Sequence, residues 1–415
     1  MSPIPEERTL DSTIALAIDG YEFISKRCQR YQSDIFQTRI LLEKTICFKG
    51  EEAAKVFYDP EKFTRKNAAP KRINKTLFGQ GGVQGMDGDA HHHRKQMFMS
   101  LMTDESIKKL ADLTENWWHT YAQKWEKMDK VVLFEEAQTV LCRAVCAWTG
   151  VPLPESEVKQ RTDELEAMID GSGAVGPRHW RGRQSRKKAE KWIEDIIEQV
   201  RNQQLEIPKE SATHVIALHR SLDGKLLDKR IAAVELINVL RPTVAIARYI
   251  TFAALALYEH PECRQLLQTS EEEYQEWFVQ EVRRFYPFFP FTSARVWQEF
   301  DWQGYHFPKG RRVLLDLYGT NRDPQLWSKP DIFLPERFRQ WNESPFNFIP
   351  QGGGNHHTNH RCPGEWITIE LMKVTLNFLT QSLEYSVPRQ NLEISLLRMP
   401  TIPKSGFIIS DIKQI

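Results

Sequence analysis

Hydrophobic positions recur at helical spacing over most of the chain. The pattern predicts helices over residues 105–126, 135–149, 157–170, 187–203, 228–258, 272–285 and 364–382. Strand-like runs are shorter and lie at 38–48, 294–306 and 311–317, with more after Tyr385. Because strands do not alternate with helices, we expect a mainly α protein with small β-sheets. No repeat or low-complexity linker divides the sequence, which indicates one domain over residues 1–415.

The segment 231–247 is apolar on nearly all sides, which predicts a helix buried through the core. Its middle holds Arg241 and Pro242. A proline inside a helix costs about 3 kcal/mol and opens a kink, and a buried, unpaired guanidinium is also costly. On this helix Glu235 lies about 120° around the axis from Arg241, and Asn238 can offer only a neutral hydrogen bond. Two unfavourable free energies at adjacent residues indicate a functional site, in which Arg241 binds a substrate carboxylate. The alternative is a structural pairing of Arg241 with an acid from elsewhere in the fold.

Two neighbouring segments, 171–177 and 178–188, are rich in glycine or in basic residues, which are common at protein surfaces. The glycine-rich segment 171–177 interrupts two helical patterns and predicts either the hinge of a lid or a solvent loop. The basic run 178–188 follows it. This run indicates either the solvated start of a helix or a surface that attracts anionic substrates or membranes.

Composition narrows the class of protein. A formal net charge of +1 gives no reason to expect nucleic acid as a partner. The N-terminus lacks the basic and apolar blocks of a signal peptide, and no apolar stretch predicts a transmembrane segment. The six cysteines form no C-x-x-C pair, and Cys142 and Cys146 share one helix face as expected of small core residues. We expect a soluble, reduced, cytoplasmic protein.

Cys362 follows a glycine-rich loop and directly precedes a helical pattern. Pro363 suits the first position of that helix, where its missing N–H costs nothing. The partial positive charge at a helix N-terminus favours thiolate over thiol. A single thiolate held in this way is the ligand that a heme-thiolate iron requires. We therefore predict that Cys362 is a metal ligand.

Two further motifs precede this cysteine. Glu281 and Arg284 form an E-x-x-R pair one helical turn apart, and Arg337 lies in Pro335-Glu-Arg-Phe338. These three side chains can brace the ligand loop through guanidinium–carboxylate contacts.

The order E-x-x-R, P-E-R-F and C-P-G resembles the cytochrome P450 superfamily over essentially the whole chain. The resemblance implies the cytochrome P450 fold, with heme b buried between a kinked distal helix and a proximal loop that carries the cysteine ligand. Cys362 is then the axial ligand of the heme iron, and Glu281, Arg284 and Arg337 are structural. One departure is Asn355, which stands seven residues before the cysteine where the superfamily usually has phenylalanine. The stretch 352–360 is therefore expected to form a longer loop.

A helix is expected to open at Asp87, and its His91 and Lys95 are spaced to point together. The resemblance implies that this pair and His360 hold the heme propionates, with Arg65 and Arg295 as weaker candidates. Read without the resemblance, the histidines 91–93 are a polar helix start or a weak metal site. Adjacent residues do not face one ligand, so a dedicated metal cage is not expected.

Ordinary oxygen-activating members of the superfamily carry an acid–threonine pair where this chain has Arg241-Pro242. The runs 234–242, 84–88 and 348–354 resemble the fatty-acid peroxygenase family. That resemblance implies hydrogen peroxide as oxidant, no redox partner, and a long-chain free fatty acid whose carboxylate binds Arg241 and serves as acid and base. Gln84 favours hydroxylation over decarboxylation, and 241–252 looks closer to the branch that hydroxylates the alpha rather than the beta carbon.

The same resemblance implies an acyl tunnel, although each of its residues alone is ordinary core. The tunnel candidates are Ala69, Phe78, Ile169, Phe288 and Phe291. Other interpretations stay open: a reductase-fed monooxygenase in which Arg241 only orients the acid, a decarboxylase that makes terminal alkenes, and a non-catalytic heme or lipid carrier. A strong thiolate donor argues against the carrier.

Overall fold

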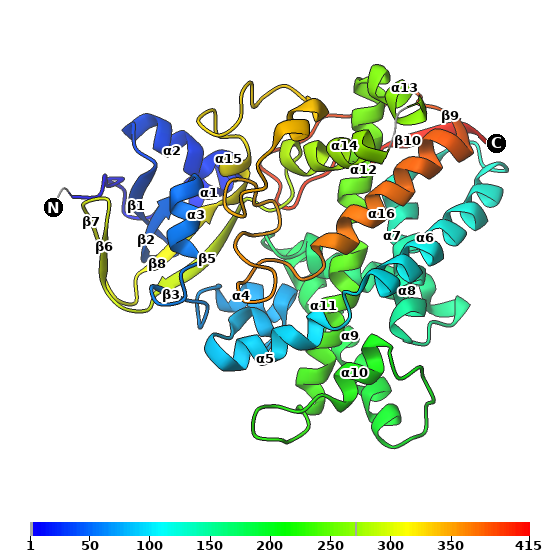
Figure 1. Cartoon of the computed structure of the whole chain (residues 1–415), viewed down its shortest axis with the longest axis horizontal. Helices are drawn as coiled ribbons and strands as arrows, with labels where there is room; N and C mark the ends of the chain where they lie inside the picture. The colour runs from blue at the N-terminus through cyan, green and yellow to red at the C-terminus, as the bar shows by residue number, and fades with distance from the viewer. Residues whose placement is uncertain (1–2, 270–271) are drawn as a thin grey trace.

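Long helices fill one side of the molecule, and a five-stranded sheet lies toward the N-terminus on the other side (Figure 1). The structure is a computed structural model that describes residues 3–269 and 272–415. The helices are α1 (Thr13–Asp19), α2 (Phe23–Tyr31), α3 (Glu51–Phe57), α4 (Lys71–Ile73), α5 (Gly88–Met99), α6 (Asp104–Trp125), α7 (Leu133–Thr149), α8 (Val158–Asp170), α9 (Pro177–Arg201), α10 (Ala212–Leu218), α11 (Lys229–Ala245), α12 (Ala247–Glu259), α13 (Pro261–Thr269), α14 (Glu272–Phe285), α15 (Leu317–Asn321) and α16 (Glu365–Asn377).

The strands are β1 (Ile35–Ile40), β2 (Glu43–Phe48), β3 (Phe63–Thr64), β4 (Val131–Val132), β5 (Phe291–Val296), β6 (Phe300–Trp302), β7 (Tyr305–Phe307), β8 (Arg312–Asp316), β9 (Leu383–Ser386) and β10 (Ile408–Gln414). The largest sheet has the order β1-β2-β8-β5-β3, in which only β2 and β8 run parallel. A second sheet has the order β4-β10-β9, and β6 pairs with β7. The expected mainly α fold with small sheets is confirmed.

Local chemistry explains where the long helices begin and end. The Thr103 hydroxyl accepts from the Ser106 N–H, 3.2 Å away, at the start of α6, and Asp228 accepts from the N–H of Arg230 and Ile231 at the start of α11. Gly150 ends α7 in the left-handed conformation that glycine adopts most easily. Helices α6, α7, α8 and α14 match the predicted ranges to within two residues.

The basic run 178–188 forms the first half of α9, which begins ten residues before the predicted 187. Pro177 occupies an initial position of this helix, where proline is favourable. Within the run, Arg186 is buried and pairs with Glu190, whereas Lys187 and Lys188 are exposed and line a shallow groove against α8. Residues 171–176 form the predicted break between α8 and α9.

The predicted helix over 228–258 is present as two consecutive helices, α11 and α12. Pro242 lies inside α11, where it removes one backbone donor from the ladder. The interruption comes at Ile246, one turn after the proline, where the N–H bonds to the Thr243 carbonyl only three residues back. The stretch 229–259 is long and apolar enough to cross a membrane, but 94% of its most apolar window is buried inside the protein. It is therefore a core helix.

The predicted strand over 38–48 is wrong in one respect, because the segment folds back on itself. β1 and β2 form an antiparallel hairpin in which Leu41 and Leu42 both have positive φ, 52° and 61°. Two leucines are not a turn signal, so the sequence pattern did not reveal this turn. Similarly, 294–306 contains parts of β5, β6 and β7, with Gln303 and Gly304 at positive φ between the last two.

The main hydrophobic core joins α6, α7, α11, α12 and α16, with Leu110, Leu141, Leu236, Leu255 and Leu371 among its buried members. Helix α11 passes through the middle of the helical region (Figure 1). Smaller clusters lie under the sheet and beside α2. The core therefore surrounds the helix that carries Arg241 and Pro242.

Glu281, Arg284 and Arg337 form one buried ion network. The Glu281 carboxylate accepts from Arg284 Nε and Nη2 at 2.7 and 2.8 Å, from Arg337 Nε, and from the Leu334 N–H. The other guanidinium N–H groups donate to backbone carbonyls of residues 321 and 328–332. The network therefore braces the 321–337 segment, and the expected direct contact with the cysteine loop is not among these bonds.

Replacing Glu281 with alanine should lower the free energy of unfolding by about 3–5 kcal/mol, because it leaves two arginines buried without a carboxylate. Denaturant unfolding of the purified protein measures this change. Glu393→Ala is the matched control: Glu393 pairs with Lys404 on the surface, and its loss should change the free energy by no more than about 1 kcal/mol. Equal losses in the two variants would contradict a structural role for the network.

Candidate active site

Cys362 lies just before α16, with Gly364 rather than Pro363 at the helix boundary. Pro363 is therefore outside the helix, contrary to the expectation that it takes the first helical position. The Cys362 N–H donates to the Gln351 carbonyl, 3.1 Å away. Burial, followed by the nearby Glu365 carboxylate, raises the pKa of the Cys362 thiol, although the Gly364 N–H opposes this. The N–H groups at the helix start alone do not offset this burial.

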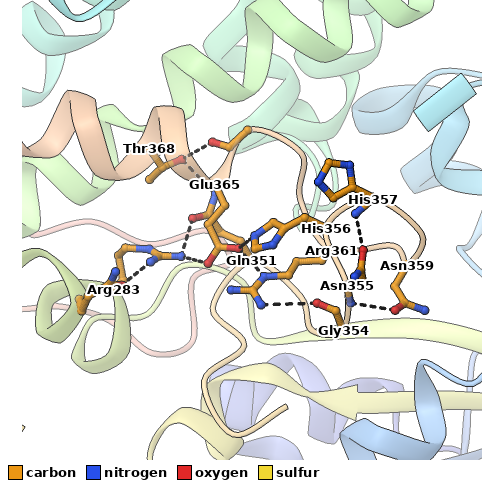
Figure 2. A network of polar contacts seen from close by, with 12 residues as sticks. Arg283, Gln351, Gly354, Asn355, His356, His357, Asn359, Arg361, Glu365 and Thr368 are labelled. Carbon is orange, nitrogen blue, oxygen red and sulfur yellow. Dashed lines mark hydrogen bonds and ion pairs between the residues drawn. The ribbon is translucent and has the colours of Figure 1, made fainter. Parts of the chain in front are cut away.

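The cysteine loop is braced by a network around Glu365, the first residue of α16 (Figure 2). The buried carboxylate is paired with Arg283 of α14 and with Arg361 Nε at 2.6 Å, and it contacts His356 Nε2 at 2.9 Å. Burial would raise the pKa of this carboxyl, but these partners hold it well below the ordinary value. Sequence reasoning missed this brace, although Arg283 lies within the E-x-x-R motif and Glu365 directly follows C-P-G.

The expectation of a longer loop over 352–360 stays a prediction, but asparagine side chains shape this stretch. Asn355 Oδ1 accepts from the N–H groups of His357 and Thr358, and Asn359 Oδ1 accepts from the Asn355 N–H at 2.8 Å (Figure 2). Gln351 Nε2 donates to Thr368 Oγ1 of α16 at 3.0 Å. Asparagine side chains thus close the loop onto its own backbone.

Helix α5 brings two propionate candidates, His91 and Lys95, to the loop that carries a third, His360. His91 stacks on His360, with ring centroids 4.0 Å apart, and His360 Nε2 lies 3.7 Å from the Asp87 carboxylate at the start of α5. Lys95 Nζ donates to the backbone carbonyls of Asn359 and Arg361. Burial lowers the pKa of Lys95 to about 8 and that of His91 to about 3, so each environment disfavours the charged form.

The two weaker propionate candidates, Arg65 and Arg295, differ in whether their charge is paired with a carboxylate. Arg65 is buried, donates to the Phe57 carbonyl at 3.4 Å and lies over the Phe57 ring. Arg295 is committed to protein groups: its Nη1 pairs with Glu43 at 2.5 Å and its Nε donates to the Asn67 carbonyl. The structure therefore argues against the expected propionate role of Arg295, because its charge is already paired.

The donor set around the cysteine loop fits a heme. Cys362 supplies a half-buried thiol, and Lys95 and Arg65 are buried cations that have no carboxylate within 4.0 Å among the residues that the structure describes. Two such cations match the two carboxylates of protoporphyrin. Residues 3–269 and 272–415 contain no group of histidine, cysteine and acidic side chains that could hold a metal ion by themselves.

Arg241 is buried in α11, with 5% of its surface exposed. Its Nη2 donates to Asn238 Oδ1 at 3.3 Å, and its Nε has no hydrogen-bond partner. Within the described part of the chain no carboxylate lies within 4.0 Å of this guanidinium. Burial and the nearby Arg186 lower the pKa of Arg241 to about 9, and Cys362 acts in the opposite direction. Arg241 and Cys362 are therefore close enough to interact electrostatically.

The acid nearest to Arg241 in sequence is occupied elsewhere. Glu235 pairs with Arg94 of α5 at 2.6 Å, and Asn238 Nδ2 donates to both Glu235 Oε2 and Gln84 Oε1 at 3.2 Å. Gly82 lets the Gln84 loop approach α11, since a Cβ at Gly82 would lie 3.1 Å from Asn238 Nδ2. Gln84 thus reaches Arg241 through Asn238.

The structure brings three of the five tunnel candidates into the core around α11. Phe78, Ile169 and Phe288 all pack in the main core, and Phe288 stacks on Tyr249 of α12 with centroids 4.4 Å apart. Phe291 instead packs against the cluster beside α2, so its tunnel role is not supported. Ala69 is half-buried, and its carbonyl accepts from Asn74 Nδ2.

A sequence model described as "Cytochrome P450" matches residues 173–409, more than half of the chain. The chain belongs to the cytochrome P450 family. Solved structures similar to this cytochrome P450 include a variant of "Cytochrome P450SP alpha (CYP152B1)", with a TM-score of 0.96 and 49% identity, covering 97% of this chain and 99% of that one.

Two more similar structures contain fatty acids. "Cytochrome P450EX alpha (CYP152N1) wild-type with myristic acid" has a TM-score of 0.97 and 46% identity, with complete coverage of both chains. A variant of "cytochrome P450 OleT" in complex with arachidonic acid has a TM-score of 0.97 and 35% identity, covering 100% of this chain and 99% of that one. The resemblance to the superfamily and to its fatty-acid peroxygenases is confirmed, and this cytochrome P450 is an oxidoreductase whose family implies heme.

Replacing Cys362 with serine should remove the thiolate ligand and therefore the ferrous–CO absorption that marks heme-thiolate proteins. The measurement is the absorption spectrum of the reduced, CO-treated holoprotein. Cys263→Ser, a change at a different cysteine that is buried, should keep the thiolate spectrum. A thiolate spectrum in the Cys362 variant would assign the ligand to another residue.

Proposed function

We propose that this protein is a peroxygenase, which uses hydrogen peroxide to hydroxylate long-chain free fatty acids at the alpha carbon. The whole chain, residues 1–415, acts as one catalytic domain and needs no redox partner. The observation that carries the proposal is the buried guanidinium of Arg241, which lies near Cys362 and lacks a protein carboxylate among the described residues. The fatty acids bound to two similar proteins support the class of substrate.

Arg241 binds the substrate carboxylate. A guanidinium is planar and can make two parallel, charge-assisted hydrogen bonds to a carboxylate. The Arg241 Nε is buried without a partner, so at least one donor is free. Pairing with an anion also offsets the desolvation of the cation, which is several kcal/mol in a protein interior. A neutral substrate cannot offset it, and this favours free acids over esters and alcohols.

The bound carboxylate also supplies the acid and base that this chain lacks at the site. Arg241 and Pro242 stand where related oxygen-activating enzymes carry an acid and a threonine, and neither can give and take a proton at neutral pH. A carboxylate held on Arg241 can take a proton from the oxidant and return it. When bound at Cys362, the heme supplies the oxidising chemistry, and thiolate ligation favours O–O cleavage.

Holding the head group also sets which carbon reacts. Because Arg241 fixes the carboxylate, the carbons next to it are the ones held near the reacting centre. Gln84 shares the Asn238 amide with the Arg241 group, and its presence favours hydroxylation over decarboxylation. Phe78, Ile169 and Phe288, which pack in the same core, form walls for the acyl chain.

The cofactor is held from two sides. Cys362 ligates the iron from the braced loop (Figure 2), and His91, Lys95, His360 and Arg65 bind the propionates from the side of α5 and β3. Lys95 and Arg65 provide the charges, since both are buried near the loop or its flanking segment without a carboxylate partner.

The proposal predicts turnover with peroxide alone. Purified holoprotein, myristic acid and hydrogen peroxide should give 2-hydroxymyristic acid, identified by mass spectrometry. A terminal alkene as main product would indicate a decarboxylase instead. Turnover that requires a reductase and a nicotinamide cofactor, with none from peroxide, would contradict the proposal.

Arg241→Ala should reduce oxidation of myristic acid by about a hundredfold or more, because the carboxylate loses its position beside the reacting centre. The rate of product formation with peroxide measures this loss, and the heme content should stay unchanged. Arg230→Ala is the matched control, since Arg230 is an exposed arginine of the same helix and should keep the wild-type rate. Full activity in Arg241→Ala would overturn the assigned role.

A further inference from the structure

Three polar residues of α11 form a chain of hydrogen bonds that winds partly around the helix. Glu235, Asn238 and Arg241 are spaced by three residues, so each lies about one turn from the next. Asn238 Nδ2 donates to Glu235 Oε2 at 3.2 Å, and Arg241 Nη2 donates to Asn238 Oδ1 at 3.3 Å. All three side chains are buried, and that of Glu235 is fully inaccessible. The mechanism above uses only the last member of this chain of hydrogen bonds.

The charge of Glu235 determines which way the Asn238 amide points. A carboxylate can only accept hydrogen bonds, so it selects the NH2 end of the amide. The carbonyl end is then turned toward Arg241, which can only donate. If the amide were reversed, its NH2 group would face the guanidinium and two donors would oppose each other. Gln84 Oε1 accepts from the same Nδ2 and supports the same orientation.

Arg94 keeps Glu235 in this role. Its Nη1 pairs with Glu235 Oε1 at 2.6 Å, and the Val83 N–H also bonds to this carboxylate. The two oxygens of Glu235 are thereby divided, one toward Arg94 and one toward Asn238. Because Glu235 is neutralised by Arg94, it does not act as the counterion of Arg241, which stays available for another anion.

We propose that Glu235, held by Arg94, is a positioning residue that acts through the Asn238 amide to hold the Arg241 guanidinium ready for the substrate carboxylate. Asn238 Oδ1 is the only hydrogen-bond acceptor that the described residues offer to Arg241. Without it, the guanidinium of a long, flexible side chain has no protein group that selects one rotamer. This inference rests on the proposed function, because it assigns how the carboxylate-binding group is oriented.

The test compares an acid with a neutral analogue. Glu235→Gln keeps the shape of the side chain but lets the new amide present either a donor or an acceptor, so Asn238 is no longer held in one orientation. Binding of myristic acid and of its alcohol, 1-tetradecanol, to the holoprotein is measured by calorimetry. We expect myristic acid to bind about tenfold more weakly to the variant, the loss typical of one hydrogen bond to a charged group, with alcohol binding unchanged.

Three further variants separate positioning from damage to the fold. In an Arg241→Ala background, Glu235→Gln should add no further loss of acid binding, because the two residues act through one contact. Glu7→Gln is the control: it changes a buried glutamate paired with Arg27 far from α11 and should leave the preference for acid over alcohol at the wild-type value.

Should Glu235→Gln fold poorly, the double variant Arg94→Met/Glu235→Gln removes both charges without leaving an arginine unpaired, and it should show the same tenfold loss.

Equal weakening of acid and alcohol binding in Glu235→Gln, or losses that add in the Arg241→Ala background, would overturn the positioning role. Unchanged acid binding in Glu235→Gln would do the same. Failure of the carboxylate-binding role proposed for Arg241 gives a different result: the wild-type protein itself would then bind acid and alcohol equally.

Discussion

The site depends on one physical constraint: the guanidinium of Arg241 is buried in the core without a carboxylate partner among the described residues. Three other buried arginines of the described chain are paired: Arg94 with Glu235, Arg283 with Glu365, and Arg284 with Glu281. Arg241 has only a neutral amide oxygen. The fold therefore neutralises several internal cations locally, but Arg241, like the propionate candidates Lys95 and Arg65, has no carboxylate partner among the described residues. An unpaired buried cation is one way in which a protein can favour a free acid over its neutral relatives.

Two buried carboxylates, those of Glu365 and Glu235, each stabilise one side of the site. Glu365 joins α14 to the cysteine loop on one side, and Glu235 joins α5 to α11 on the other. Neither carboxylate is placed to react with a substrate, because each is saturated by arginine and other donors. Their effect is instead to fix the ligand loop and the distal helix as rigid parts, which is what precise orientation of a bound molecule requires.

Sequence patterns predicted the parts of this arrangement that depend on local order. Long amphipathic or buried helices, the cysteine before a helix and the cost of Arg241-Pro242 are all visible in the chain. The hairpin turn at Leu41-Leu42 was not, because its positive φ values come from strand pairing and not from turn residues. Glu365 and Arg283 were missed because partners 82 residues apart in sequence are set by packing alone. The contacts of Arg295 with Glu43 and of Phe291 with the cluster beside α2 were not visible in the sequence for the same reason.

Helix α5 touches both halves of the site within two turns. His91 and Lys95 contact the residues just before the cysteine, and Arg94, between them, reaches α11. The helix therefore links the cysteine loop to α11. Each added residue turns a helix by about 100°. An insertion within α5 would therefore break its contacts with the cysteine loop and with α11 together. The length of this helix is thus under the same constraint as the residues it carries.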